Sequence, residues 1–141
     1  MIFVCGRGPG AAGAVRYLAE RKIKTRVFTH NDDPDMYAVC DEFGIGWTQR
    51  SVNDPDAWPW HPSAIVSIGY LRIINPHVLE MVNRRVINCH YALLPNHRGR
   101  SAVPWAIVDG DQVTGITYHW VDEGIDTGRV LLQAVCSIEP T

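Results

Sequence analysis

Three polar side chains, Asn88, His90 and Tyr91, stand at the end of a short apolar run and could do chemistry together. Successive side chains of a strand point to opposite faces, so Asn88 and His90 share one face. In an open α/β sheet, ligands bind outside the carboxyl ends of the strands. We therefore expect a carboxamide and an imidazole at that edge, each able to contact the same reacting oxygen or amine.

A carboxylate is the natural third member of such a site. Asp126 lies in a polar turn, residues 123–128, between two later predicted strands. With Asn88 and His90 it would supply a donor for a developing oxyanion, a group that titrates near neutral pH and a carboxylate to orient that group. Each residue alone also has a structural interpretation, as a turn cap, a satisfied histidine or a loop aspartate. Spacing leaves open whether Asp126 meets His90.

The elements that would position these residues alternate between strand and helix. The patterns predict strands at 2–5, 24–29, 64–70, 85–88, 115–122 and 129–138, helices at 11–21, 36–43, 76–83 and 102–108, and a loop at 45–62. This order predicts an α/β fold, a Rossmann-like open, mostly parallel twisted sheet with helices on both faces. We expect one domain over residues 1–141, truncated or incompletely observed at its C-terminus because no helix follows the last strand.

The turn after the first strand is rich in glycine. Gly6-x-Gly8-x-x-Ala11, with Asp32 or Asp33 after the second strand, matches the loose dinucleotide fingerprint. A tight turn that lets the first helix pack closely explains the same residues, and Pro9 inside the motif favours this second interpretation.

Composition narrows the function classes. The net charge of −2, with 46% hydrophobic and 20% charged residues, is typical of a soluble globular protein and makes a nucleic-acid partner unlikely. No apolar run approaches the ~18 residues of a membrane span, and the first residues read as a strand, so we expect no membrane association. The cysteines form no C-x-x-C pair and no His/Cys cluster suggests a metal, which indicates a cytoplasmic protein with free thiols: Cys5, Cys40, Cys89 and Cys136.

Several ordered motifs together resemble the catalytic domain of the folate-dependent formyltransferases. This family includes methionyl-tRNA formyltransferase, glycinamide ribonucleotide formyltransferase and the amino-sugar N-formyltransferases. The resemblance covers about residues 64–133. Its motifs are Asn88-x-His90-x-x-Leu93-Leu94-Pro95-x-x-Arg98-Gly99, Pro104-x-Ala106-Ile107 with Gly110, Gly115-Ile116-Thr117, and Asp122-Glu123-Gly124-Ile125-Asp126-Thr127-Gly128.

The resemblance implies roles for individual residues. Asn88, His90 and Asp126 fall on the family's catalytic residues. The positions that fall on its folate pocket are Tyr70, Leu71, Arg72, Ile73, Ala92, Leu93, Leu94, Pro95, Val121, Asp122, Glu123 and Gly124. Ala92 stands where the family usually has serine, so one hydroxyl is missing there. The family's glycine-rich turn binds no dinucleotide, which supports the packing interpretation of that segment.

The implied activity is transfer of a formyl group from N10-formyltetrahydrofolate, as co-substrate and without a metal, to a small-molecule primary amine. The Arg98-Gly99 and Pro104-x-Ala106-Ile107 pattern is similar to the tRNA and amino-sugar branches, and Tyr118-His119-Trp120 to the amino-sugar enzymes. Because the charge disfavours tRNA, we expect the amine of a nucleotide-linked sugar. The alternatives are a methionyl-tRNA acceptor, a non-catalytic folate- or nucleotide-binding module and, last, a Rossmann oxidoreductase.

Other polar and aromatic residues near these motifs have two interpretations. His119 and Trp120 fit the core or an edge of a strand as well as a functional role. Tyr91, His97 and Trp105 are candidate acceptor contacts or loop packing. A homodimer is an open alternative to a monomer.

Overall fold

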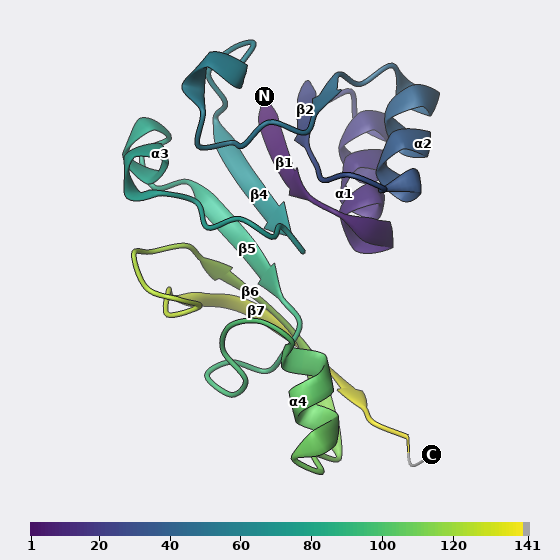
Figure 1. The fold of residues 1–141 in the computed structure, drawn as a ribbon, viewed down its shortest axis with the longest axis vertical. Coiled ribbons are helices and arrows are strands. Elements are labelled where there is room, and N and C mark those ends of the chain that lie inside the picture. The colour runs from purple at the N-terminus through teal and green to yellow at the C-terminus, as the bar shows by residue number, and fades with distance from the viewer. Residues whose placement is uncertain (140–141) are drawn as a thin grey trace. The chain divides into compact units, whose positions relative to one another are not determined.

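The computed structural model describes residues 1–139, which form two compact units, Met1–Val86 and the part of the chain from Ile87 onward. In the first unit, a parallel sheet has the strand order β3-β2-β1-β4, and α1 and α2 lie side by side (Figure 1). The elements of this unit are β1 (Ile2–Gly6), α1 (Gly8–Glu20), β2 (Thr25–Phe28), α2 (Pro34–Phe43), β3 (Trp47–Thr48), the 3-10 helix η1 (Pro55–Ala57), β4 (Ala64–Ile68) and α3 (Pro76–Met81).

The first sheet is covered on both faces, as its continuous apolar strands require. Phe3 in β1 is fully buried, and its ring lies 5.2 Å from that of Trp58 and 4.9 Å from that of Trp60. On the opposite face, Gly6 of the same strand lies against Ala11 of α1. At β1, α1 therefore packs on one face of the sheet and tryptophan side chains pack on the other.

The glycine-rich turn is built for close packing. A Cβ atom on Gly6 would lie 2.1 Å from the carbonyl oxygen of Ile68 and 3.0 Å from Cβ of Ala11. The backbone N–H of Gly8 donates to the carboxylate of Asp33, at 3.2 and 3.3 Å from its two oxygens, and Asp33 is 3% exposed. The chain's own carboxylate thus takes the amide that a dinucleotide's pyrophosphate would use, which favours the packing interpretation.

The prediction that residues 45–62 form only a loop is wrong in two places. Backbone N–H groups of Val27 and Thr29 donate to the carbonyls of Gly46 and Thr48, at 3.1 and 3.0 Å, so β3 extends the sheet beside β2. Asp54 accepts from the backbone N–H of Asp56 and begins η1. Both elements are too short for a periodic pattern to reveal them.

The second unit contains β5 (Val86–His90) from Ile87 onward, α4 (Ala102–Val108), β6 (Val113–Trp120) and β7 (Val130–Ser137). β5 pairs with β6 and β6 with β7, all antiparallel (Figure 1). β5 extends two residues beyond the predicted end at residue 88 because His90 pairs with Thr117 of β6. The predicted α/β class is confirmed, and no helix within residues 1–139 is long and apolar enough to span a membrane.

Replacing Gly6 by alanine tests the close approach of β1, β4 and α1. We expect Gly6→Ala to lower the free energy of unfolding by about 1–3 kcal/mol, because the new Cβ overpacks backbone that cannot move aside. Gly13→Ala, at an exposed α1 position with nothing within 4 Å of its Cβ, should raise it by about 0.5–1 kcal/mol. Urea unfolding measures both; equal effects would contradict the packing role of Gly6.

Candidate active site

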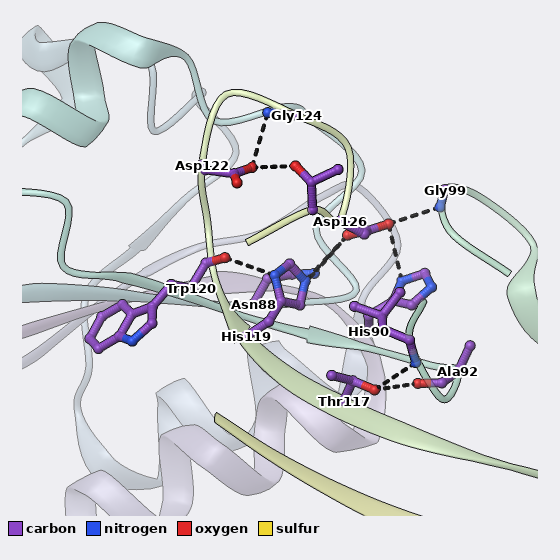
Figure 2. A network of polar contacts seen from close by, with 12 residues as sticks. Asn88, His90, Ala92, Gly99, Thr117, His119, Trp120, Asp122, Gly124 and Asp126 are labelled. Atoms are coloured by element: carbon purple, nitrogen blue, oxygen red, sulfur yellow. Dashed lines mark hydrogen bonds and ion pairs between the residues drawn. The ribbon is translucent and has the colours of Figure 1, made fainter. Parts of the chain in front are cut away.

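The carboxylate of Asp126 lies at the centre of a polar network in the second unit (Figure 2). Its side chain is 14% exposed. Oδ2 accepts a hydrogen bond from the backbone N–H of Gly99 at 2.8 Å and lies 3.4 Å from Nδ1 of His90. The structure therefore brings Asp126 next to His90, the contact that spacing left open.

The second oxygen of Asp126 faces two further side chains. Oδ1 lies 3.4 Å from Nε2 of His119 and 3.5 Å from Nδ2 of Asn88. His119 is 2% exposed, and its Nδ1 lies 2.8 Å from the carbonyl oxygen of Trp120. Asn88, His90 and Asp126 are thus in one cluster, which His119 joins.

Strand register explains why these side chains converge. In the antiparallel pairing of β5 with β6, Asn88 lies opposite His119 and His90 opposite Thr117. Directly paired residues, and those two positions apart, project from the same face of a sheet. The four side chains are therefore held on one face by backbone pairing, before any side-chain contact forms.

The connection between β6 and β7 presents Asp126 to that face. The backbone N–H of Trp120 donates to the carbonyl of Arg129 at 3.0 Å and closes the loop. Within it, Oδ1 of Asp122 accepts from the N–H of Gly124 at 3.0 Å and from the hydroxyl of Thr127 at 2.6 Å. The resemblance places four pocket residues in this loop, Val121–Gly124. One of them, Asp122, holds the shape of the loop through these two hydrogen bonds.

Opposing effects act on the pKa values of Asp126 and His119. Burial acts to raise the pKa of Asp126, but hydrogen bonds from His119 and Gly99 and the nearby histidine charges hold it below its ordinary value of 3.8. Burial acts to lower the pKa of His119, but the hydrogen bond and charge of Asp126 and the carbonyl of Trp120 raise it above 6.5. A carboxylate that stays ionised thus supports the proton of an adjacent imidazole.

His119 can also orient Asn88. Its Nε2 lies 3.3 Å from Nδ2 of Asn88. Because the carbonyl of Trp120 can only accept, Nδ1 of His119 carries a proton, and a neutral ring presents a bare Nε2 that accepts from the carboxamide. A protonated ring instead donates from Nε2 to Asp126. The protonation state of His119 therefore decides which contact it makes.

Both ring nitrogens of His90 face oxygens that accept hydrogen bonds. Nε2 lies 2.7 Å from the carbonyl oxygen of His97, and Nδ1 faces Asp126. His90 is 7% exposed, so these protein contacts replace those with water. Such an imidazole is held in one orientation and is suited to hold or donate a proton beside the Asn88 carboxamide.

The predicted pocket segment at Ala92–Pro95 is fixed by side chains of the same unit. The buried hydroxyl of Thr117 donates to the carbonyl of Ala92 at 2.7 Å and accepts from the N–H of Leu94 at 3.1 Å. Gln133 Nε2 donates to the carbonyl of Leu94 at 2.9 Å. A Cβ on Gly115 would lie 2.7 Å from Cδ2 of Leu93, so this glycine makes room for that side chain.

The other predicted pocket segment, Tyr70–Ile73, follows β4 in the first unit. The N–H of Leu71 donates to Nε2 of His30 at 3.0 Å, and the Tyr70 hydroxyl accepts from the N–H of Val52 at 3.1 Å. Burial, and then the charges of neighbouring arginines, lower the pKa of His30, which keeps its Nε2 an acceptor. The apolar side chains of Leu71 and Ile73 are 49% and 68% exposed.

Two contributors to the cluster carried weak or no sequence signal. The core interpretation of His119 accounts for its burial but not for its contact with Asp126. The alternation of Thr117 and His119 on a strand next to the one bearing Asn88 and His90 is the pattern that indicates a shared face. The N–H of Gly99 is a backbone donor, and backbone donors have no signature in residue type.

The remaining predicted residues have separate environments. Tyr91 is 39% and Trp105 55% exposed, whereas the imidazole of His97 contacts Asp111. Across residues 1–139, no group of three His, Cys, Asp or Glu side chains is arranged to hold a metal ion.

The chain is similar to a known protein family and to several known proteins. The family described as "Formyl transferase" matches residues 1–141. GDP-perosamine N-formyltransferase of Brucella melitensis is 32% identical over 150 aligned residues, covering 99% of this chain and 58% of that protein. Methionyl-tRNA formyltransferase of Synechococcus sp. is 47% identical over 75 residues, covering 53% of this chain and 23% of that protein.

A solved structure shares the fold. The N-formyltransferase of Helicobacter canadensis, in complex with folinic acid and dTDP-3-aminofucose, superposes with a TM-score of 0.82 over 97% of this chain and 52% of that one, at 20% identity. The chain thus spans little more than half the length of its sugar-modifying relatives.

Asp126→Asn tests the coupling between the carboxylate and His119. Because burial remains while the charge that opposes it is lost, we expect the pKa of His119 to fall from above 6.5 to below it. The folding stability that the His119 proton adds in the wild type, present at low pH and lost as pH rises through the raised pKa, should also disappear. NMR titration of the ring measures the shift. Asp122→Asn removes a charge that acts more weakly on His119 and should shift the pKa of the ring less. An unchanged titration of His119 in Asp126→Asn would refute the coupling.

Proposed function

The chain belongs to the formyl transferase family, and on that premise we propose that it transfers a formyl group from N10-formyltetrahydrofolate to a primary amine. One observation carries the proposal. Asn88 and His90 project from one face of β5 toward a shared, mostly buried carboxylate, Asp126. A donor, a proton-carrying ring and an ionised orienting group are the parts that acyl transfer to an amine needs.

The donor supplies a one-carbon unit at the formyl oxidation level. In the transfer, a bond forms between the amine nitrogen and the formyl carbon, and the bond from that carbon to N10 breaks. The amine loses one proton and N10 gains one, so no oxidant or reductant is needed. What the protein must provide is a place for negative charge on the formyl oxygen and a path for one proton.

Asn88 and His90 are the groups that stabilise the negative charge on the formyl oxygen. The carboxamide N–H can donate to the formyl oxygen as charge develops on it. Both ring nitrogens of His90 face protein acceptors, so a protonated ring acts on that oxygen through its positive charge. Removing one donor from an oxyanion hole costs roughly 10²–10³ in kcat. The carboxylate of Asp126 lies 3.4 Å from Nδ1 and holds the ring in place.

His90 and Asp126 also handle the proton. Because Nε2 of His90 already donates to the carbonyl of His97, Nδ1 beside Asp126 is the nitrogen that can take a proton from the attacking amine through a water and return one to N10. General acid–base catalysis of this kind contributes roughly 10²–10⁴ to a rate. The low pKa of Asp126 keeps its carboxylate ionised beside His90.

The segments assigned to the donor fit a flat, hydrogen-bonding ring. Leu71 and Ile73 expose apolar side chains on a loop whose backbone His30 holds. In the second unit, Thr117 fixes the backbone of the loop that carries Leu93 and Leu94. Ligand pockets combine such apolar surface with a few fixed polar groups. The folinic acid in the related Helicobacter canadensis structure supports the assignment.

The acceptor that we propose is the amine of a nucleotide-linked sugar. Similarity to GDP-perosamine N-formyltransferase extends over 99% of this chain, whereas similarity to methionyl-tRNA formyltransferase covers 53% of it. A panel of amines decides the acceptor: GDP- and dTDP-linked amino sugars, glycinamide ribonucleotide and methionyl-tRNA. We expect saturable release of tetrahydrofolate with a nucleotide sugar. Turnover with another member only would replace the proposed acceptor, and donor binding without any turnover would indicate a binding module.

Replacing the cluster residues one at a time tests the mechanism. We expect His90→Ala and Asp126→Ala to lower kcat by roughly 10²–10⁴, and Asn88→Ala by roughly 10²–10³, because each removes a group that acts in the transition state. The KM for the donor should change little. Steady-state formyl transfer measures this.

The matched control for these variants is Arg16→Gln. It removes an exposed ion pair between Arg16 and Glu42 in the first unit, which should leave the rate unchanged and the stability close to that of the wild type. Full activity in His90→Ala or Asp126→Ala would rule out the proposed mechanism.

A further inference from the structure

We propose that His97 is a positioning residue, whose imidazole is clamped by Asp111 so that the His97 carbonyl holds Nε2 of His90 in place. This inference deepens the proposed function and rests on His90 being the catalytic histidine. It assigns a role to a cluster of His97, Asp109 and Asp111 that the reaction does not otherwise use.

The contact between the two histidines defines the state of the catalytic ring. His90 Nε2 lies 2.7 Å from the carbonyl oxygen of His97. A carbonyl oxygen only accepts hydrogen bonds, so the proton of this contact belongs to Nε2. Nδ1 is thereby the nitrogen that faces Asp126, at 3.4 Å. The position of one backbone carbonyl thus determines how the ring is presented to its carboxylate.

The backbone at His97 does not favour this position by itself. His97 has φ +51°, in the left-handed region that residues with a side chain seldom adopt. Gly99, two residues later, also has a positive φ, +83°, so two left-handed residues occur close together in this loop. A loop of this shape needs contacts that hold it, and the side chain of His97 makes them.

Two carboxylates bracket the imidazole of His97, which is 15% exposed. Nε2 lies 2.6 Å from Oδ2 of Asp111, and Nδ1 lies 3.7 Å from Oδ2 of Asp109. The first distance is that of a strong hydrogen bond to a carboxylate, and the second is that of a looser contact. Asp111 is therefore the main partner of His97 and Asp109 a secondary one.

The carboxylates stand on a turn that is anchored to α4. The N–H of Asp109 donates to the carbonyl of Trp105 at 2.8 Å, and the N–H of Asp111 to that of Ala106 at 2.9 Å. Gly110, with φ +77°, permits the turn between them. A connected path of contacts therefore runs from α4 through Asp111 and His97 to the ring of His90.

The same loop contacts the other half of the catalytic pair. Two residues after His97, the N–H of Gly99 donates to Oδ2 of Asp126 at 2.8 Å. If the clamp is released, the partners of both His90 and Asp126 shift together. The clamp is consequently a determinant of the rate rather than of donor affinity, since misplacement of catalytic groups by about 1 Å can cost up to ~10²-fold in rate.

Ring NMR of His90 in the whole chain tests the clamp without relying on activity. In the wild type, ¹⁵N spectra should show Nε2 protonated and hydrogen-bonded. In Asp111→Ala we expect that signal to move toward its solvent-exposed value and its proton to exchange faster. Asp111→Asn, which keeps an acceptor oxygen for His97, should largely restore the wild-type spectrum. Asp109→Asn removes the same charge from the looser partner and should change the spectrum less.

Kinetics of the same variants separate positioning from a purely structural role. We expect Asp111→Ala and His97→Ala to lower kcat roughly tenfold with little change in donor KM, and the double variant to lose no more than either single one. Unchanged His90 signals in a folded Asp111→Ala protein, or no rescue by Asp111→Asn, would overturn the proposal. A wild type that transfers no formyl group but shows the expected NMR changes would overturn the proposed function and leave the clamp standing.

Discussion

The candidate site depends on one mostly buried carboxylate, that of Asp126, whose two oxygens face four donor groups. Asp126 takes a backbone hydrogen bond from Gly99 and faces two imidazoles and a carboxamide, of His90, His119 and Asn88. Burying a charge is costly unless it is paired and hydrogen-bonded. These donors offset that cost, and the hydrogen bonds from His119 and Gly99 with the charges of both histidines hold the pKa of Asp126 low. The carboxylate in turn keeps its partners in a defined orientation.

The rest of the second unit can be understood from that requirement. The β5–β6 register places Asn88, His90 and His119 on one face, and the closed loop after β6 brings Asp126 to them. Each of the two imidazoles that face Asp126 makes a second contact with a backbone carbonyl: His119 with that of Trp120, and His90 with that of His97. Supporting contacts of this kind keep catalytic side chains in a productive geometry, because a free side chain samples several rotamers.

Much of this could be predicted from sequence, and the limits have physical reasons. Apolar strands alternating with helices indicated the α/β class, and the period of two put Asn88 and His90 on a common face. Spacing could not show that Asp126 reaches them, because a loop carries no periodic signal. His119 was hidden because burial and function give a histidine on a strand the same pattern. The backbone groups of Gly99 and His97 were invisible, since any residue type carries them. The Gly6–Gly8 turn is the opposite case, because its sequence suggested a ligand site. In the structure, the carboxylate of Asp33 accepts the hydrogen bond from the Gly8 N–H that a ligand would need.

The central claim is that Asp126 is an ionised carboxylate whose donors define the site. A ¹³C NMR titration of its carboxyl carbon measures this most directly. The carboxyl should remain ionised to a pH below its ordinary pKa of 3.8, and replacing His119 by a residue without a donor should raise that pKa. A carboxyl that takes up its proton at or above pH 3.8 in the wild type would contradict the account.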